Sequence, residues 1–193
     1  MAAVDLDPGA ARPQLHLVLG PARSGKSRWA EHLAARSGLG VVYVATGASR
    51  PGDQAWQQRL ARHRQRRPAH WRTLEIAAVE QLVPGLVTLT SNQLALVDSL
   101  GSWVAAALPQ DELAWDRLCQ ALLAAVDDLR CALILVSEQT GWGVVPPTAI
   151  GGLFRDRLGT IERQLVARAS TSWLVVAGRA ISLDAIGHAV PSD

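Results

Sequence analysis

The chain has 193 residues, of which 49% are hydrophobic and 19% charged, a composition typical of a single globular domain. The 19 basic and 17 acidic residues leave a formal net charge of +2, so no general positive field recruits nucleic acid or anionic lipid. Cys119 and Cys131 are too few for a disulfide framework and lack the spacing of a zinc site, so we expect a cytoplasmic protein. The apolar runs are too short for a membrane span.

Alternating apolar and amphipathic segments predict an α/β fold. Strands are expected at 15–19, 41–45, 72–76, 94–97, 132–136 and 173–177, and helices directly after the loop at 20–25, at 54–67, at 111–130 and within 148–169. This alternation favours a mostly parallel sheet with helices on both faces. We expect residues 1–13 to be a disordered arm, 14–183 one nucleotide-binding catalytic domain and 184–193 a tail.

The strongest motif is a phosphate-binding loop at residues 20–27. These residues fit the pattern Gly, four residues, Gly, Lys, Ser/Thr, and they stand between an expected strand and an expected helix. They are Gly20, Pro21, Ala22, Arg23, Ser24, Gly25, Lys26 and Ser27. In such a loop the backbone N–H groups surround the β-phosphate, Lys26 reaches the β- and γ-phosphate oxygens, and the Ser27 hydroxyl binds Mg²⁺. Lys26 is the only lysine in the chain, which favours nucleotide binding over a turn that merely caps a helix.

A magnesium-bound nucleotide also requires an acid after a buried strand. Asp98 and Glu138 both follow apolar runs, and Asp98 is the better placed of the two. We therefore predict that Ser27 and Asp98 hold the metal. A helix N-cap is the alternative role for Asp98, because Ser99 and Gly101 stand beside it.

Six arginines and two histidines lie between residues 59 and 72. Because the rest of the chain is nearly neutral, the phosphates of a nucleotide held by the loop are the expected partner. A solvated basic helix face is the alternative, and nucleic acid is less favoured because no aromatic residues alternate with the arginines. Within this segment His63 and His70 are candidates for an acid, a base or a nucleophile, and composition does not choose between them.

Several sequence blocks resemble one enzyme family, the bifunctional adenosylcobinamide kinase/adenosylcobinamide-phosphate guanylyltransferases of cobalamin assembly. The upstream blocks are GPARSGKSR at 20–28, VYVAT at 42–46, RLARH at 59–63 and RPAHWRTLE at 67–75. Similar downstream blocks follow in the same order at 98–103, 141–146, 154–159 and 173–178, so the likeness covers about residues 15 to 183.

The resemblance implies a RecA-like fold and two reactions on one corrinoid, adenosylcobinamide. In the first reaction ATP or GTP phosphorylates its aminopropanol hydroxyl, and in the second GMP passes from GTP to that phosphate through a guanylylated histidine. His63 occupies the position of that histidine, and Lys26 serves both reactions. The family residues around the guanine nucleotide correspond to Thr46, Gly47, Arg67, Pro68, Ala69 and Glu75. The resemblance also implies a homo-oligomer, commonly a trimer.

The chain departs from the family pattern at three places. Ser99 and Gly101 replace the Cys and Thr of an Asp/Glu-Cys-Leu-Thr block, and Glu138-Gln139 replaces Asn-Glu. Glu162-Arg163 replaces Asn-Gln after the Phe-Arg-Asp block.

Two other functions fit the residues less fully. One is a phosphate-loop kinase of another small metabolite, which would use Lys26 and Asp98 but no covalent histidine. The other is a nucleotide-gated binding module in which the arginine-rich helix is an interface. Trapping of acid-labile GMP on the protein separates the first from a guanylyltransferase, and corrinoid-dependent GTP turnover separates the second.

Overall fold

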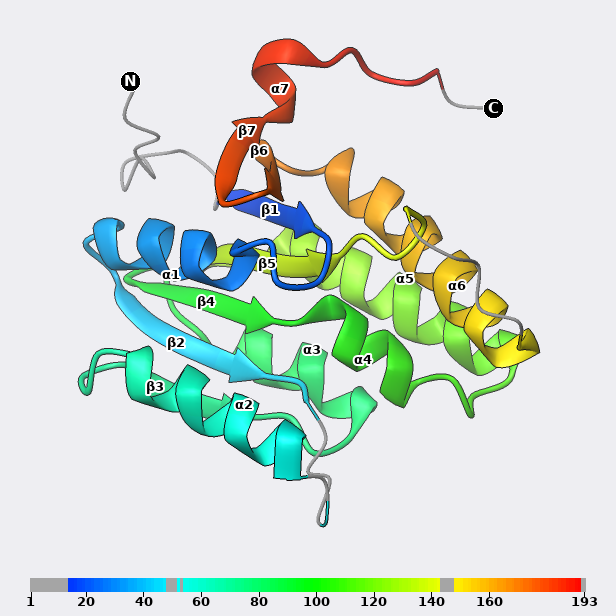
Figure 1. Ribbon diagram of the computed structural model, residues 1–193, viewed down its shortest axis with the longest axis horizontal. Coiled ribbons are helices and arrows are strands. Elements are labelled where there is room, and N and C mark those ends of the chain that lie inside the picture. The colour runs from blue at the N-terminus through cyan, green and yellow to red at the C-terminus, as the bar shows by residue number, and fades with distance from the viewer. Residues whose placement is uncertain (1–13, 48–51, 53, 143–147, 192–193) are drawn as a thin grey trace.

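The computed structural model describes residues 14–47, 52, 54–142 and 148–191, in which one sheet lies between two sets of helices (Figure 1). The strands are β1 (Leu15–Gly20), β2 (Gly40–Ala45), β3 (Arg72–Glu75), β4 (Gln93–Asp98), β5 (Ala132–Glu138), β6 (Thr171–Val176) and β7 (Arg179–Ser182). The helices are α1 (Lys26–Arg36), α2 (Gln54–Arg66), α3 (Leu82–Val87), α4 (Leu100–Ala106), α5 (Glu112–Asp128), α6 (Ala149–Val166) and α7 (Leu183–Ile186), with a 3-10 turn at Val79–Gln81.

The strands form a seven-stranded sheet in the order β3-β2-β4-β5-β1-β6-β7. Every neighbouring pair is parallel except β6 and β7, which are antiparallel. The predicted mostly parallel α/β sheet is therefore confirmed, and each of the six expected strands is present. The sequence reading missed β7 and the short helices α3, α4 and α7.

The end of β6 differs from its prediction. The strand stops at Val176, and Ala177 and Gly178, with φ of 48° and 73°, form the two-residue turn into β7. Two consecutive positive φ values are what a tight hairpin between twisted strands requires, and Ala is an unusual residue there. Because the turn lacks an Asn-Gly or Asp-Gly signal, its sequence looks like the continuation of a strand.

Beyond β7, the short helix α7 extends into the segment expected to be a tail. Asp184 Oδ2 in this helix accepts a hydrogen bond from Ser172 N at 2.6 Å.

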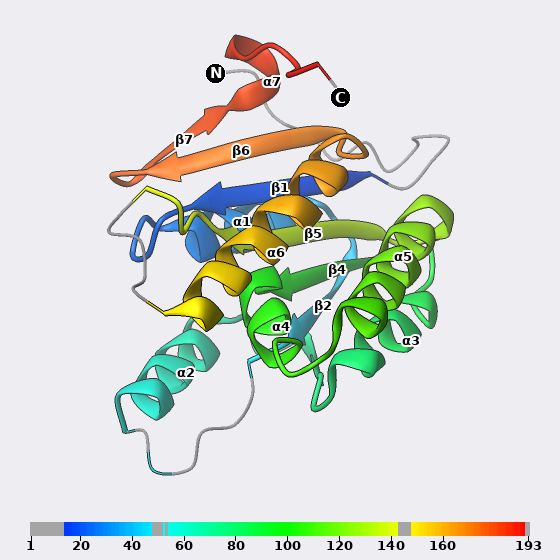
Figure 2. The same cartoon turned by 90° about the vertical axis from the view of Figure 1, so that its right-hand side faces the viewer.

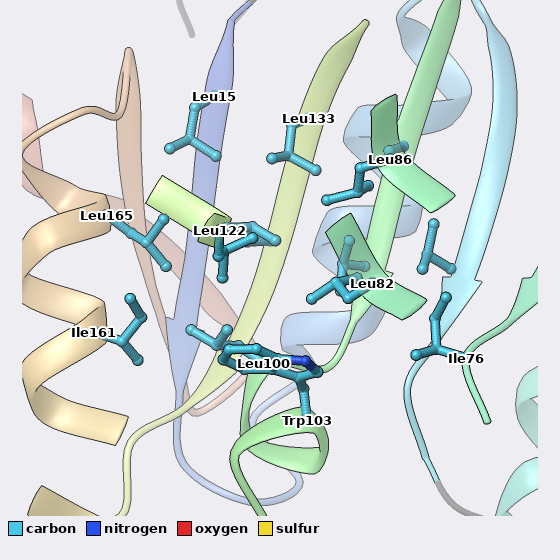
Figure 3. Close-up of a cluster of buried hydrophobic side chains, with 14 of the residues drawn as sticks. Leu15, Ile76, Leu82, Leu86, Leu100, Trp103, Leu122, Leu133, Ile161 and Leu165 are labelled. Atoms are coloured by element: carbon cyan, nitrogen blue, oxygen red, sulfur yellow. The ribbon is translucent and has the colours of Figure 1, made fainter. Parts of the chain in front are cut away.

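Helices cover both faces of the sheet, as predicted. The Ala30, Leu33 and Ala34 side chains of α1 pack on one face, and α3, α4, α5 and α6 cover the other, which Figure 2 shows turned toward the viewer. The larger cluster, on the α6 face, is drawn in Figure 3. Leucines dominate it, and Trp103 is 1% exposed with its Nε1 donating to the Val79 carbonyl oxygen at 2.9 Å. None of the helices that the structure describes is long and apolar enough to cross a membrane.

Candidate active site

The candidate site lies at the carboxyl ends of β1 and β5. At this point the helices that follow the strands change from one face of the sheet to the other. The helix after β1 is α1, which packs on one face, whereas the helix after β5 is α6, which packs on the other. Neighbouring parallel strands whose helices go to opposite faces leave a crevice at their carboxyl ends, and ligands bind there. Gly20 and Glu138, the last residues of β1 and β5, are paired in register at this position.

The phosphate loop is held tightly between the sheet and α1. A Cβ on Gly20 would lie 2.3 Å from the Val175 carbonyl oxygen and 2.8 Å from Ser24 Oγ, so only glycine fits. Gly25, just before α1, has φ of 102°, which glycine adopts at little cost. The Gly178 N–H donates to the Ser24 carbonyl oxygen at 3.3 Å, so the β6–β7 turn supports the loop from outside.

Lys26 is buried although it carries a charge. It is 4% exposed, and its Nζ donates to the Pro21 carbonyl oxygen at 3.5 Å. A buried ammonium needs anionic or dipolar partners, because removing a charge from water is costly. The lysine therefore stands inside the loop, where phosphate oxygens bind in loops of this type.

Asp98 ends β4 and is fixed by a residue of the adjacent strand. The Tyr43 hydroxyl donates to Asp98 Oδ2 at 2.8 Å. Burial, and next the Asp98 charge, raise the pKa of Tyr43 above its ordinary value, so the phenol stays protonated and remains a donor. On the other side of the Tyr43 ring, Arg67 Cζ lies 3.2 Å from the ring centroid. Arg67, a predicted nucleotide residue, is thus linked to the predicted metal ligand through Tyr43.

Thr46 has a structural contact that the sequence did not reveal. It is 3% exposed, its hydroxyl donates to the Ser99 carbonyl oxygen at 2.6 Å, and its Oγ1 accepts from Ser99 N at 2.9 Å. Both bonds hold the turn between β4 and α4. Gly47, the next residue, is half-buried at the carboxyl end of β2.

Glu138 is the residue whose importance the sequence understated. Its Oε2 is buried and makes no hydrogen bond with the described residues. Burial raises the pKa of Glu138, the Asp98 charge raises it further, and the Ser99 hydroxyl and the Lys26 ammonium oppose these effects. A Cβ on Gly101 would lie 2.0 Å from Glu138 Oε2, so the carboxylate occupies space that any other residue at position 101 would fill. Only the folded chain brings these positions together.

The arginine-rich helix α2 stands apart from the helical layers (Figure 2). Its backbone is described at His63, but the side chains of Arg59, Arg62 and His63 lie outside the described residues. Two ion pairs join α2 to its surroundings. Arg64 Nη2 lies 2.8 Å from Glu75 Oε1 in an exposed pair, and Arg66 Nη2 lies 3.1 Å from Glu31 Oε1 in a half-buried one. After the helix, the Pro68 carbonyl accepts from Trp71 N at 3.0 Å, and Ala69 and His70 are exposed.

The predicted site residues therefore form two groups at one edge of the sheet. Residues 20–27 and Asp98 gather around β1, β5 and β4, whereas Arg67, Pro68, Ala69 and Glu75 lie around β3 and the end of α2. Four strand spacings separate β1 from β3, a distance of about 19 Å. Tyr43 connects the two groups, because its ring contacts Arg67 and its hydroxyl donates to Asp98.

The donor atoms near the loop fit a magnesium ion. Ser27 and Asp98 supply a hydroxyl and a carboxylate, and Mg²⁺ typically takes one or two carboxylates together with substrate phosphates. Among the residues that the structure describes, no group of three or more His, Cys, Asp or Glu side chains could hold a metal alone. Glu138 Oε2, which is buried and makes no hydrogen bond with the described residues, lies at the same end of the sheet.

Comparison with known proteins decides the family. Residues 16–183 match the family model described as cobinamide kinase / cobinamide phosphate guanyltransferase. The chain belongs to this family. It is 43% identical over 167 residues to the bifunctional adenosylcobalamin biosynthesis protein CobP of Pseudomonas aeruginosa, with 84% of this chain and 92% of the relative covered. It is 34% identical over 182 residues to the CobU protein of Escherichia coli K12, with 86% and 98% covered.

More distant proteins share the fold of this chain. A solved ATPase of a bacterial type III secretion system superposes with a TM-score of 0.58 at 10% identity, covering 91% of this chain and 59% of that one. This likeness concerns the fold alone. Together with the strand order, it bears out the predicted RecA-like phosphate-loop architecture.

The departures from the family pattern pair up in space. Gly101, near the start of α4, stands against the Glu138 carboxylate at the end of β5. Toward α6, Gln139 Nε2 donates to Glu162 Oε2 at 3.1 Å. Burial raises the pKa of Glu162 to about 7, and the Glu138 charge adds to the shift. Substitutions that look unrelated along the chain are therefore neighbours in the fold.

Proposed function

We propose that this member of the cobinamide kinase and guanylyltransferase family uses Lys26 and Asp98 at the loop for both of its reactions and His63 for the second. The chain is a bifunctional enzyme of adenosylcobalamin biosynthesis. We propose which of its residues perform each step. The observation that carries it is the buried Lys26 inside a phosphate loop at the point where the sheet changes its winding.

In the kinase step, the loop holds the triphosphate of ATP or GTP. Its backbone N–H groups and Lys26 neutralise charge on the β- and γ-phosphates, and this charge stabilisation supplies most of the catalysis in phosphoryl transfer. Asp98, oriented by the Tyr43 hydroxyl, and Ser27 would hold Mg²⁺. A bound metal ion would supply positive charge that stabilises the phosphates.

In the guanylyl step, an imidazole nitrogen of His63 attacks the α-phosphorus of GTP. The N–P bond forms, the bond to the β-phosphate oxygen breaks, and pyrophosphate leaves with the electron pair. The adenosylcobinamide phosphate oxygen then displaces the histidine and yields adenosylcobinamide-GDP. Arginines of α2 would balance the charge of the phosphates. Glu75 at the end of β3, with Arg67, Pro68, Ala69, Thr46 and Gly47, would surround the guanosine.

Further elements of the proposal concern the assembly and its location. The corrinoid and the nucleotides are the partners, the active form is a homo-oligomer such as a trimer, and the enzyme works in the cytoplasm. Both cysteines are free thiols, which agrees with a reducing compartment.

The test is labelling with α-labelled GTP in two matched variants. We expect His63→Ala to remove acid-labile, alkali-stable GMP from the protein and to abolish GMP transfer, with kinase activity largely kept. His70→Ala is the control, because His70 lies in the same basic segment and is exposed. General electrostatic damage would lower labelling in both variants alike. Label that persists without His63 and disappears without His70 would reassign the nucleophile, and loss of kinase activity in both would contradict the division of labour.

A further inference from the structure

The geometry points to Glu138 as a catalytic residue of the kinase step, the carboxylate that takes the proton of the acceptor hydroxyl. This inference rests on the proposed nucleotide site, since it needs the γ-phosphate to lie at Lys26. It concerns a residue that replaces Asn in the family pattern, so it is specific to chains with this substitution.

Glu138 lies in the sheet directly beside the start of the phosphate loop. It ends β5 opposite Gly20, the first residue of the phosphate loop, and Gln139 N donates to the Gly20 carbonyl oxygen at 2.9 Å. Ile134 and Val136, the alternate residues before it, pack on the face that carries α1. Because side chains alternate along a strand, Glu138 belongs to that same face, on which Lys26 begins α1.

The state of the carboxylate is a further argument. Oε2 is buried and has no hydrogen-bond partner among the described residues, although the Ser99 hydroxyl and the Gly101 N–H act on the same carboxyl group. A buried oxygen without a partner is costly. Lys26 is near enough for its ammonium to affect Glu138, and a lysine at this place in a phosphate loop contacts the β- and γ-phosphates. An unpaired acceptor beside the γ-phosphate is what an attacking hydroxyl needs for its proton.

Gly101 leaves the space that the Glu138 carboxylate occupies. A Cβ there would come within 2.0 Å of Oε2, although the residue lies in α4, where Ala would be the better helix former. The glycine thus costs helix stability and allows the carboxylate its position. Such a local cost is typical of functional sites.

The chemistry separates the two reactions of the enzyme. In the kinase step the acceptor is an alcohol, so its oxygen bonds to the γ-phosphorus, the bond to the β-phosphate oxygen breaks, and the proton passes to Glu138. The nucleoside diphosphate leaves with the electron pair, and the carboxylic acid returns its proton to water. In the guanylyl step the acceptor is a phosphate oxyanion that has no proton to lose. A proton acceptor is therefore required in the first reaction only.

The experiment measures both reactions in Glu138→Gln, which keeps the size of the side chain and removes its ability to accept a proton. We expect the kinase kcat to fall about 100-fold or more, with nucleotide KM changed less than about threefold. GMP transfer to preformed adenosylcobinamide phosphate should stay within about threefold of the unmodified enzyme. Equal loss of both reactions would show a role in folding or nucleotide binding and would overturn the inference.

Gly101→Ala tests the same point with Glu138 intact. The new methyl group must displace the carboxylate, so we expect the same selective loss of kinase activity. Gly152→Ala in α6 is the matched control, since a Cβ there meets nothing within 4 Å. Thermal unfolding verifies that each variant is folded. If Gly101→Ala behaves like Gly152→Ala, the position of the carboxylate does not matter and the inference fails.

Lys26→Ala separates this inference from the proposed function. If Lys26→Ala abolishes the kinase while Glu138→Gln leaves it unchanged, Glu138 is not the proton acceptor and the nucleotide site stands. If neither substitution affects the kinase, the nucleotide site itself is wrong, and the inference falls with it.

Discussion

The phosphate-loop end of the sheet and the arginine-rich helix α2 are built in opposite ways. At the loop, Lys26 is buried, Gly20 has no room for a Cβ, and Asp98 is held by Tyr43. In α2, the ion pair of Arg64 with Glu75 is exposed, and such pairs contribute little stability. The loop region is preorganised by packing, whereas the contacts described for the α2 side chains Arg64 and Arg66 are ion pairs.

This difference matches the chemistry proposed for the two regions. Stabilising charge on a phosphoryl group requires dipoles and an ammonium that are already in place. A histidine that first receives GMP and then passes it on must meet two different partners in turn, the donor GTP and the acceptor adenosylcobinamide phosphate. Arg67, directly after α2, contacts the ring of Tyr43, and the Tyr43 hydroxyl donates to Asp98, so these two side chains connect the regions.

The largest effect is expected at the centre of the packed region. Lys26→Ala should lower both kinase and guanylyl activity by about 100-fold to 1,000-fold, because the chain has no other lysine to balance the phosphates. Corrinoid-dependent turnover of GTP measures it, and circular dichroism checks the fold. Unchanged turnover would refute the loop as the phosphate site.

A smaller effect is expected at Asp98, the last residue of β4. Asp98→Asn should raise the Mg²⁺ concentration for half-maximal activity by about tenfold or more, since an amide is a weaker ligand for a hard cation. The Tyr43 hydroxyl can still donate to the amide oxygen, so the fold should be kept. A magnesium titration identical to that of the unmodified enzyme would move the metal to Glu138.

Glu75→Gln probes the exposed region. A carboxylate can accept from guanine N1–H and N2–H₂, which adenine lacks, so the variant should lose about tenfold in its preference for GTP over ATP in GMP transfer. The lost pair with Arg64 is exposed and should not affect stability measurably. Competition between the two nucleotides gives the ratio, and an unaltered ratio would remove Glu75 from the base site.

Glu162→Gln should have the smallest effect on activity and a visible effect on stability. Burial raises the pKa of Glu162 from 4.5 to about 7, so the folded protein binds more protons than the unfolded chain between these pH values. The free energy of unfolding should therefore fall as the pH rises from 4.5 to 7, by up to about 3 kcal/mol. The neutral variant should lose this slope in urea unfolding, and a slope that persists would assign it to another group.

The sequence by itself determined the parts of this protein that depend on neighbours along the chain. Continuous apolar runs located five of the six expected strands, because strands buried on both faces need no alternation. The loop at 20–27 was recognisable because glycine, lysine and serine must stand at fixed spacing between a strand and a helix. The order of the family blocks then indicated the RecA-like fold, and the observed sheet agrees with it.

The tertiary structure decided which distant residues share a site. It placed Thr46 against the Ser99 backbone, Tyr43 beside Asp98, and Glu138 in the space left by Gly101, pairs that lie 37 to 55 residues apart. It also placed β1 and β3 four strand spacings apart, which no motif spacing reveals. These relations depend on strand order and register. Because a parallel sheet pairs strands that are far apart in the sequence, local sequence patterns do not predict them.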